Sequence, residues 1–240
     1  MTNVKFETPE ELDSFVIRLA QLCGKTINVA NPLLDGVLPD GSRVQATLAT
    51  DIARRGSNFT IRKFTKDPLT PAHLLQWETI DVRTLAYLWF AVDYGSSIMI
   101  SGGTATGKTS MLNVLSLFIR PEYKIVSIED TPELKLPHPH WVPHVARVAI
   151  AEGGKDVDMF ALLKESLRQR PDYIVVGEVR GREAYVMFQQ MATGHAALAT
   201  IHAESFDKLV DRLTTPPISL PASLLENLDV IVFMSRIKYR

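Results

Sequence analysis

The chain has 240 residues, 46% of them hydrophobic, which fits one large soluble domain or two smaller ones. Its 26 basic and 27 acidic side chains are spread evenly, which argues against a nucleic-acid binder held by bulk charge and against a polybasic membrane anchor. The single cysteine, Cys23, excludes an intramolecular disulfide and a zinc site of several cysteines, and no apolar stretch has the form of a signal peptide or a bilayer span.

Residues 1–65 predict a small α+β lobe. A helix is expected over residues 8–24, because a Thr-Pro-Glu-Glu capping pattern begins it, apolar residues follow at helical spacing and a glycine ends it. The Asp35-Gly36 pair that follows is typical of a turn. Alternation of apolar and polar residues then predicts strands over residues 43–48 and 58–64.

Residues 66–80, with two prolines, predict a linker, and residues 81–240 predict a second, larger lobe. In the larger lobe, helices of about three turns alternate with short apolar strands. This order is typical of a parallel sheet covered by helices on both faces. The expected strands are 97–101, 124–128, 173–176, 196–200 and 230–233.

The first of these strands leads into a phosphate-binding motif. The sequence Gly-Gly-Thr-Ala-Thr-Gly-Lys-Thr matches the P-loop pattern, and it stands between a strand and a helix as that motif requires. The alternative is a glycine-rich turn with a chance lysine, which the full match disfavours. Lys108 is expected to reach the β- and γ-phosphates, and the Thr109 hydroxyl is expected to ligate Mg²⁺. The expected nucleotide-binding residues are Gly102, Gly103, Thr104, Ala105, Thr106, Gly107, Lys108, Thr109 and Ser110.

Two acidic residues stand where strands end. The carboxyl ends of parallel strands line the ligand crevice of such a sheet, so Glu129 is placed to polarise an attacking water. Glu178 ends a second apolar strand that resembles a Walker B strand, and it is expected to hold Mg²⁺ through water or to act as the base. Gly177 occupies the position of the usual Walker B aspartate. The alternative for either acid is a residue that caps the next helix.

Several ordered motifs together resemble one family, the secretion and type IV pilus assembly ATPases. Residues 128–134 resemble the Asp box of that family, and residues 167–183 resemble its Walker B block, in which a Gly-Glu ending is normal. Residues 193–203 look like its His box, and residues 54–64 resemble the end of its N-terminal domain. The resemblance covers residues 8–235 and is closest to the archaeal branch, which includes the archaellum motor.

The resemblance implies an α/β fold, in which a RecA-like P-loop NTPase domain follows a partial α+β N-terminal lobe. It also implies ATP and Mg²⁺ as cofactors and a homo-hexameric ring at the inner face of the cell membrane. The ring would act on an integral-membrane platform protein, and through it on a filament or a secreted protein, without direct contact with nucleic acid. In this family, arginines of the N-terminal lobe approach the phosphates, and the matching positions here are Arg54, Arg55 and Arg62.

Three further residues match functional positions of the family. Arg180 follows the Walker B glutamate, although it could also pair with Glu183 one helical turn later. His195 and His202 are candidates for a γ-phosphate sensor, and the alternative is a satisfied core or interface histidine. A zinc site formed with other histidines is rejected, since no acid or cysteine completes a ligand set at suitable spacing.

The sequence therefore predicts an ATPase that powers secretion or filament assembly. Members of the family usually carry further structure at both ends, so a truncated form is expected. One alternative is a DNA-transfer ATPase of the conjugation type, which shares these motifs. Another is a nucleotide-gated interaction module with little turnover; a kinase is less well supported, because no second substrate site is visible.

Overall fold

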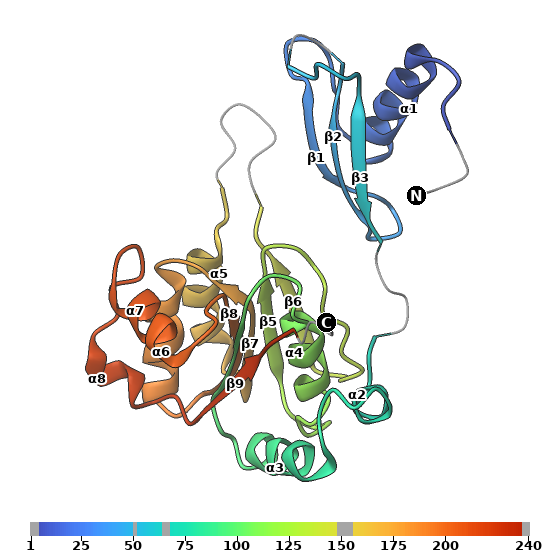
Figure 1. The fold of residues 1–240 in the computed structure, drawn as a ribbon. Helices are drawn as coiled ribbons and strands as arrows, with labels where there is room; N and C mark the ends of the chain where they lie inside the picture. Colours follow the sequence, from blue (N-terminus) through green and yellow to red (C-terminus); the bar gives the residue numbers. More distant parts are fainter. Residues whose placement is uncertain (1–4, 50–51, 64–67, 148–155, 237–240) are drawn as a thin grey trace. The chain divides into compact units, whose positions relative to one another are not determined.

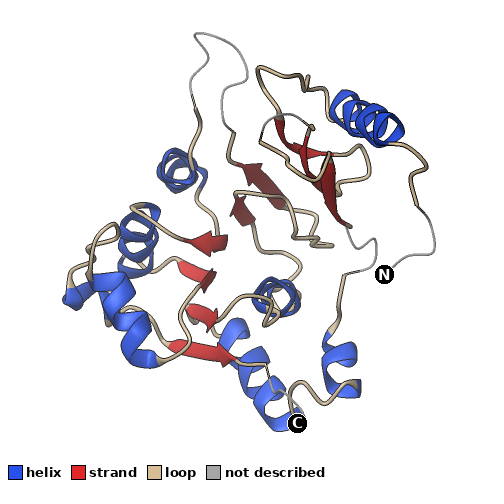
Figure 2. Cartoon of the chain, turned by 45° about the horizontal axis from the view of Figure 1, so that its top comes forward, coloured by secondary structure: helices blue, strands red, loops and turns tan. Residues whose placement is uncertain are grey.

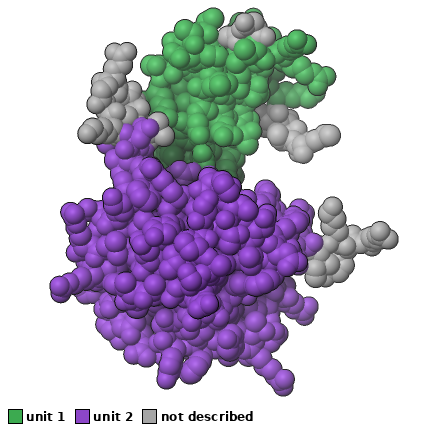
Figure 3. Space-filling model, turned by 90° about the vertical axis from the view of Figure 1, so that its left-hand side faces the viewer, with its two compact units in different colours: residues 1–66 green, residues 67–240 purple. Residues whose placement is uncertain are grey.

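The computed structural model describes residues 5–49, 52–63, 68–147 and 156–236. The chain divides into two compact units, Met1–Lys66 and Asp67–Arg240, which Figure 3 draws in different colours. Each unit has a hydrophobic core of its own. Within the described ranges, no helix combines the length and the apolar character that a bilayer span requires.

The first unit packs one helix on a three-stranded antiparallel sheet (Figure 1). Thr8 caps the helix, since its hydroxyl oxygen accepts a hydrogen bond from the backbone N–H of Glu11 at 3.2 Å. Val16 and Leu19 on the helix pack in one core with Val44 of the sheet. The elements are α1 (Pro9–Leu22), β1 (Leu33–Val37), β2 (Arg43–Thr47) and β3 (Asn58–Arg62).

Strand β1 contradicts the prediction of a turn at Asp35-Gly36. Both residues lie inside the strand and pair in register with β2. A Cβ atom on Gly36 would lie 2.8 Å from the Cβ of Cys23, at the end of α1. Glycine is therefore needed here for the close approach of helix and strand, and not for a turn.

The second unit is built on a six-stranded sheet in which every pairing is parallel. The strand order is β6-β5-β7-β8-β4-β9, so the strand before the P-loop lies inside the sheet. The strands are β4 (Ile98–Gly102), β5 (Ile125–Glu129), β6 (Trp141–Val145), β7 (Tyr173–Val179), β8 (Ala196–Ile201) and β9 (Val230–Met234). The helices are α2 (Pro71–Gln76), α3 (Val82–Asp93), α4 (Lys108–Ser116), α5 (Met159–Ser166), α6 (Glu183–Ala192), α7 (Phe206–Thr214) and α8 (Ala222–Leu225), with a 3₁₀ turn at Leu167–Gln169.

Helices cover both faces of this sheet (Figure 2). On β4, Ile98 and Ile100 belong to the core shared with α3 and α4, whereas Met99 belongs to the core shared with α5, α6 and α7. Successive side chains of a strand point to opposite faces, so a continuous apolar run is what a doubly covered strand requires.

Two elements of this unit differ from the simple sequence pattern. Strand β6 is not among the five strands that the sequence predicts. It contains Pro143, which an edge strand tolerates because the backbone on its outer side pairs with no neighbouring strand. Helix α2 lies within the segment that the sequence assigns to a linker, and its Leu74 is buried in the core with α3 and α4.

Candidate functional site

The P-loop joins β4 to α4 through residues with special backbone geometry. Gly107, directly before the helix, has φ of 90°, and Ala105 has φ of 58°, so both are left-handed. A Cβ atom on Gly102 would collide with the backbone oxygen of Met234 on β9. The loop therefore needs a glycine at this first position, because the neighbouring strand leaves no room for a side chain.

The loop presents hydrogen-bond donors and a cation. Within the described part of the chain, the backbone N–H groups of residues 104–107 donate no hydrogen bond, and the first turn of α4 adds further free donors. The Lys108 ammonium donates to the backbone oxygen of Gly103 at 2.7 Å, and the Thr106 hydroxyl donates to the same oxygen at 3.0 Å. These donors at a helix N-terminus fit the phosphate chain of a nucleotide. Thr109 and Ser110 lie in the same first turn.

The environment of Lys108 combines burial with a nearby acid. Burial lowers the pKa of the Lys108 ammonium, and the negative charge of Glu178 acts in the opposite direction. Glu178 lies on β7, so this charge interaction brings the end of a separate strand close to the P-loop lysine. The arrangement places a cation and a carboxylate where magnesium and phosphate oxygens would both find partners.

Glu129 lies at the carboxyl end of β5 and is 2% exposed. One of its carboxylate oxygens accepts hydrogen bonds from the backbone N–H groups of Glu133 and Leu134, at 2.8 and 3.0 Å. Burial nevertheless raises the pKa of the Glu129 carboxyl to about 7. A carboxyl group poised near neutral pH beside a phosphate site is suited to accept a proton.

The glycine in the Walker B position has a steric reason. A Cβ atom on Gly177 would lie 3.2 Å from Cγ of Glu129, on the neighbouring strand. That is tighter than most real contacts, so even the first atom of a side chain at position 177 would crowd the Glu129 side chain.

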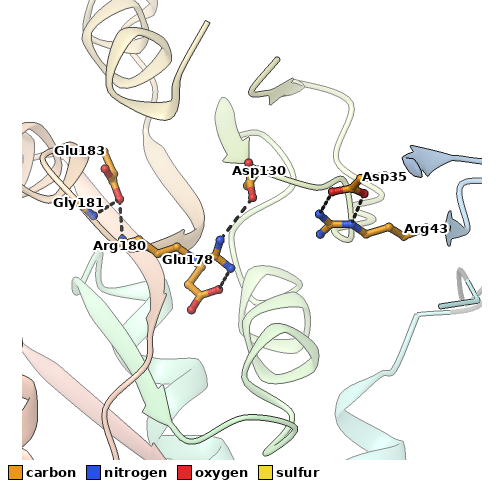
Figure 4. Close-up of polar contacts among 7 residues, drawn as sticks. All are labelled: Asp35, Arg43, Asp130, Glu178, Arg180, Gly181 and Glu183. Atoms are coloured by element: carbon orange, nitrogen blue, oxygen red, sulfur yellow. Dashed lines mark hydrogen bonds and ion pairs between the residues drawn. The ribbon is translucent and has the colours of Figure 1, made fainter. Parts of the chain in front are cut away.

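Arg180 forms a bridge between two acidic residues (Figure 4). Its guanidinium donates to the Glu178 carboxylate at 2.6 Å and to Asp130 at 3.5 Å. The alternative pairing with the Glu183 side chain does not form: that carboxylate accepts instead from the backbone N–H groups of Arg180 and Gly181, at 2.6 and 2.7 Å. Arg180 thus links Glu178 of β7 to Asp130, which follows β5, while the Glu183 carboxylate holds the turn that precedes α6.

The structure separates the two candidate histidines. His202 follows the carboxyl end of β8, the edge that carries the P-loop, and it lines a pocket there. His195 precedes the amino end of the same strand and lies 3.2 Å from the Thr193 hydroxyl. Since the strands are parallel, His195 is at the edge of the sheet opposite the phosphate site, and the structure does not bring it to that site.

Glu204 is a residue of this edge that sequence reasoning missed. Its carboxylate would lie 3.2 Å from a Cβ atom on Gly103, so it lies directly against the P-loop, and it accepts a hydrogen bond from Lys208 at 3.0 Å. The sequence signal that could have found Glu204 is its position just after the predicted strand 196–200, two residues beyond His202.

The remaining candidates have no described connection to this edge. Arg54 and Arg55 are exposed in a turn before β3, and Arg62 ends β3. All three belong to the first unit, and their approach to the phosphates stays a prediction. Among the residues that the structure describes, no group of three or more histidine, cysteine, aspartate or glutamate side chains could hold a metal ion by itself.

Known proteins resemble the chain over most of its length. The model of the family "Type II/IV secretion system protein" matches residues 1–233. The Methanocaldococcus jannaschii protein MJ0900 is 44% identical over 239 residues, which are 100% of this chain and 43% of that protein. The Bordetella pertussis type IV secretion system protein PtlH is 30% identical, covering 95% of this chain and 77% of PtlH. A Mycobacterium tuberculosis protein named for conjugal transfer is 33% identical, covering 85% and 60%.

Solved structures show the same fold. The VirB11 ATPase of the Brucella suis type IV secretion system has a TM-score of 0.52 at 27% identity, covering 92% of this chain and 74% of VirB11. The Legionella pneumophila ATPase DotB has a TM-score of 0.68 at 18% identity, covering 95% and 64%. The fold is accordingly α/β, with a RecA-like domain after an N-terminal lobe. This chain spans 43% of the length of MJ0900 and less than two thirds of the length of two further M. jannaschii proteins that it resembles. The match of the family model over residues 1–233, together with the P-loop and the strand-end acids, shows that the chain belongs to the type II/IV secretion system protein family.

Proposed function

We propose that the chain hydrolyses ATP to power protein secretion or the assembly of a type IV pilus-like or archaellum-like filament. One observation carries this proposal: the P-loop lysine, Lys108, lies at the same sheet edge as two strand-end carboxylates, Glu129 and Glu178. A phosphate cradle alone would bind a nucleotide, whereas a neighbouring base is what hydrolysis adds.

Each residue of the edge then has a role. Magnesium ATP, when bound, supplies the phosphoanhydride bond and the charge of the metal. The free N–H groups of the P-loop and Lys108 would hold the phosphates, and Thr109 and Glu178 would hold the metal, directly or through water. Glu129 orients the attacking water and takes its proton, which requires the carboxylate form that prevails above about pH 7.

Other residues complete the chemistry around this centre. Arg180 fixes the Glu178 carboxylate, and His202 detects the terminal phosphate. One or more of Arg54, Arg55 and Arg62 stabilises the charge that develops on the transferred group, and an arginine in this role accelerates hydrolysis by several orders of magnitude.

At the level of the machine, we propose a homo-hexamer at the inner face of the cell membrane. It would act on an integral-membrane platform protein, and through it on a filament or a secreted protein. The names of VirB11 and PtlH, which are secretion-system proteins, support this setting. The evenly spread charge supports a substrate that is not nucleic acid.

Replacement of the P-loop lysine tests the proposal. Lys108→Ala should lower steady-state phosphate release to background, because the phosphates lose their central cation. Lys164→Ala, at an exposed position on α5, is the matched control and should keep the parent rate. Light scattering on the same samples would report ring formation. If Lys108→Ala hydrolyses ATP like the parent, this loop is not the catalytic site.

Transfer of DNA is the second candidate, which the conjugal-transfer relative favours. It predicts direct DNA binding that weakens steeply with salt.

Ring formation and nucleotide binding without phosphate release would instead favour a nucleotide-gated interaction module. The feature that favours such a module is the burial of Glu129, whose carboxylate is already bound to the backbone N–H groups of Glu133 and Leu134.

A further inference from the structure

An open pocket of about 550 Å³ lies beside the P-loop. Its wall comes from the residues after β7 and β8, from α7 and from the Pro216-Pro217 segment. Glu204 forms part of this wall and also lies against Gly103 of the P-loop, so the pocket borders the proposed phosphate site directly.

The basic residues of this pocket differ in their partners. Lys208 is bound to Glu204 at 3.0 Å, and Arg180 is bound to Glu178 at 2.6 Å. Arg212, on α7, has a buried Nε atom with no hydrogen-bond partner, and no described residue forms an ion pair with its guanidinium. Asp211 also lines the pocket, but its exposed carboxylate forms no ion pair with Arg212.

An unpartnered, partly buried guanidinium points to an anion that is bound from outside the chain. A buried donor on a charged group loses its water and is unfavourable unless an acceptor replaces that water. His202 and Lys208 add donors on the same wall. A ligand with several acceptor oxygens, such as a tetrahedral oxyanion, would satisfy donors from all these directions at once.

We propose that this pocket is a second anion site, which receives inorganic phosphate after it leaves the P-loop, with Arg212 as its main ligand. The source of the phosphate rests on the proposed ATPase function, whereas the binding of phosphate does not. The position of Glu204 between pocket and P-loop is consistent with a short transfer from one site to the other.

Calorimetric titration of inorganic phosphate into the full chain tests the site. The P-loop is first filled with a non-hydrolysable ATP analogue and Mg²⁺, so that phosphate cannot bind there. The parent should still bind one phosphate, and Arg212→Gln should weaken this binding at least about tenfold. Arg212→Lys, which keeps the charge and most of the side chain, should bind with an intermediate affinity. Arg83→Gln, at an exposed position on α3, should bind like the parent.

Three results would overturn the proposal. Equal affinity of Arg212→Gln and the parent would remove Arg212 from the site. Loss of all phosphate binding once the P-loop is filled would leave only one anion site. Displacement of phosphate by acetate at equal concentration would mean that the pocket binds carboxylates and is not a phosphate site. Failure of the ATPase proposal is distinguishable, because the parent would then bind phosphate in this pocket without hydrolysing ATP.

Discussion

At the residue scale, the burial of Glu129 makes the stability of the fold depend on pH. Its carboxyl ionises near 4.5 in an unfolded chain and near 7 in the folded one. Below about pH 4.5 both states are protonated and burial has no ionic cost. Between the two values only the unfolded chain releases its proton, so stability falls as pH rises, and above about pH 7 the whole loss is present.

Glu129→Gln should therefore be more stable than the parent at pH 8, by about 1–3 kcal/mol, and equal to it near pH 4.5. The amide oxygen can still accept from the Glu133 and Leu134 N–H groups without a buried charge. Urea denaturation at both pH values measures the difference. Glu226→Gln, an exposed substitution, should show no such pH dependence. A Glu129→Gln variant that is less stable than the parent at pH 8 would contradict the burial argument.

At the scale of elements, the neighbouring strands β5 and β7 leave room for only one large side chain, that of Glu129, beside Gly177. Gly177→Asp introduces an aspartate at the Walker B position, where its side chain would crowd Glu129 and add a second negative charge. We expect a loss of about 1–3 kcal/mol in the free energy of unfolding, measured by chemical denaturation. Gly177→Ala, which adds only Cβ, should lose less. The double variant Gly177→Asp/Glu129→Ala should regain stability, and a fully stable Gly177→Asp would refute the explanation by crowding.

At the scale of the whole molecule, two units with separate cores predict separable functions. The fragment 67–240 should fold alone, with a cooperative melt by circular dichroism, and should bind a non-hydrolysable ATP analogue as the full chain does. Its hydrolysis should fall by about 10³-fold or more, because the arginines of the first unit are missing. Single Arg54→Ala, Arg55→Ala and Arg62→Ala variants of the full chain would identify which arginine acts. A fragment that hydrolyses ATP at the full rate would exclude all three.

The sequence by itself determined the P-loop, the five expected strands of the large sheet and the two acids at their ends. Each of these features depends on consecutive residues: a glycine-rich run between a strand and a helix, or an apolar run that ends in a carboxylate. The parallel arrangement then puts all carboxyl ends at one edge, which is why Lys108, Glu129 and Glu178 could be grouped without a structure.

Only the tertiary structure decided the features that depend on distant neighbours. Gly36 lies in a strand that the end of α1 approaches closely, rather than in a turn, and a side chain at Gly177 would crowd Glu129 on the neighbouring strand. The burial of Glu129 and the lack of a described partner for the Arg212 guanidinium likewise depend on packing between segments far apart in the chain. A local pattern specifies backbone conformation and strand direction, whereas burial and pairing are set by which segments the fold brings together.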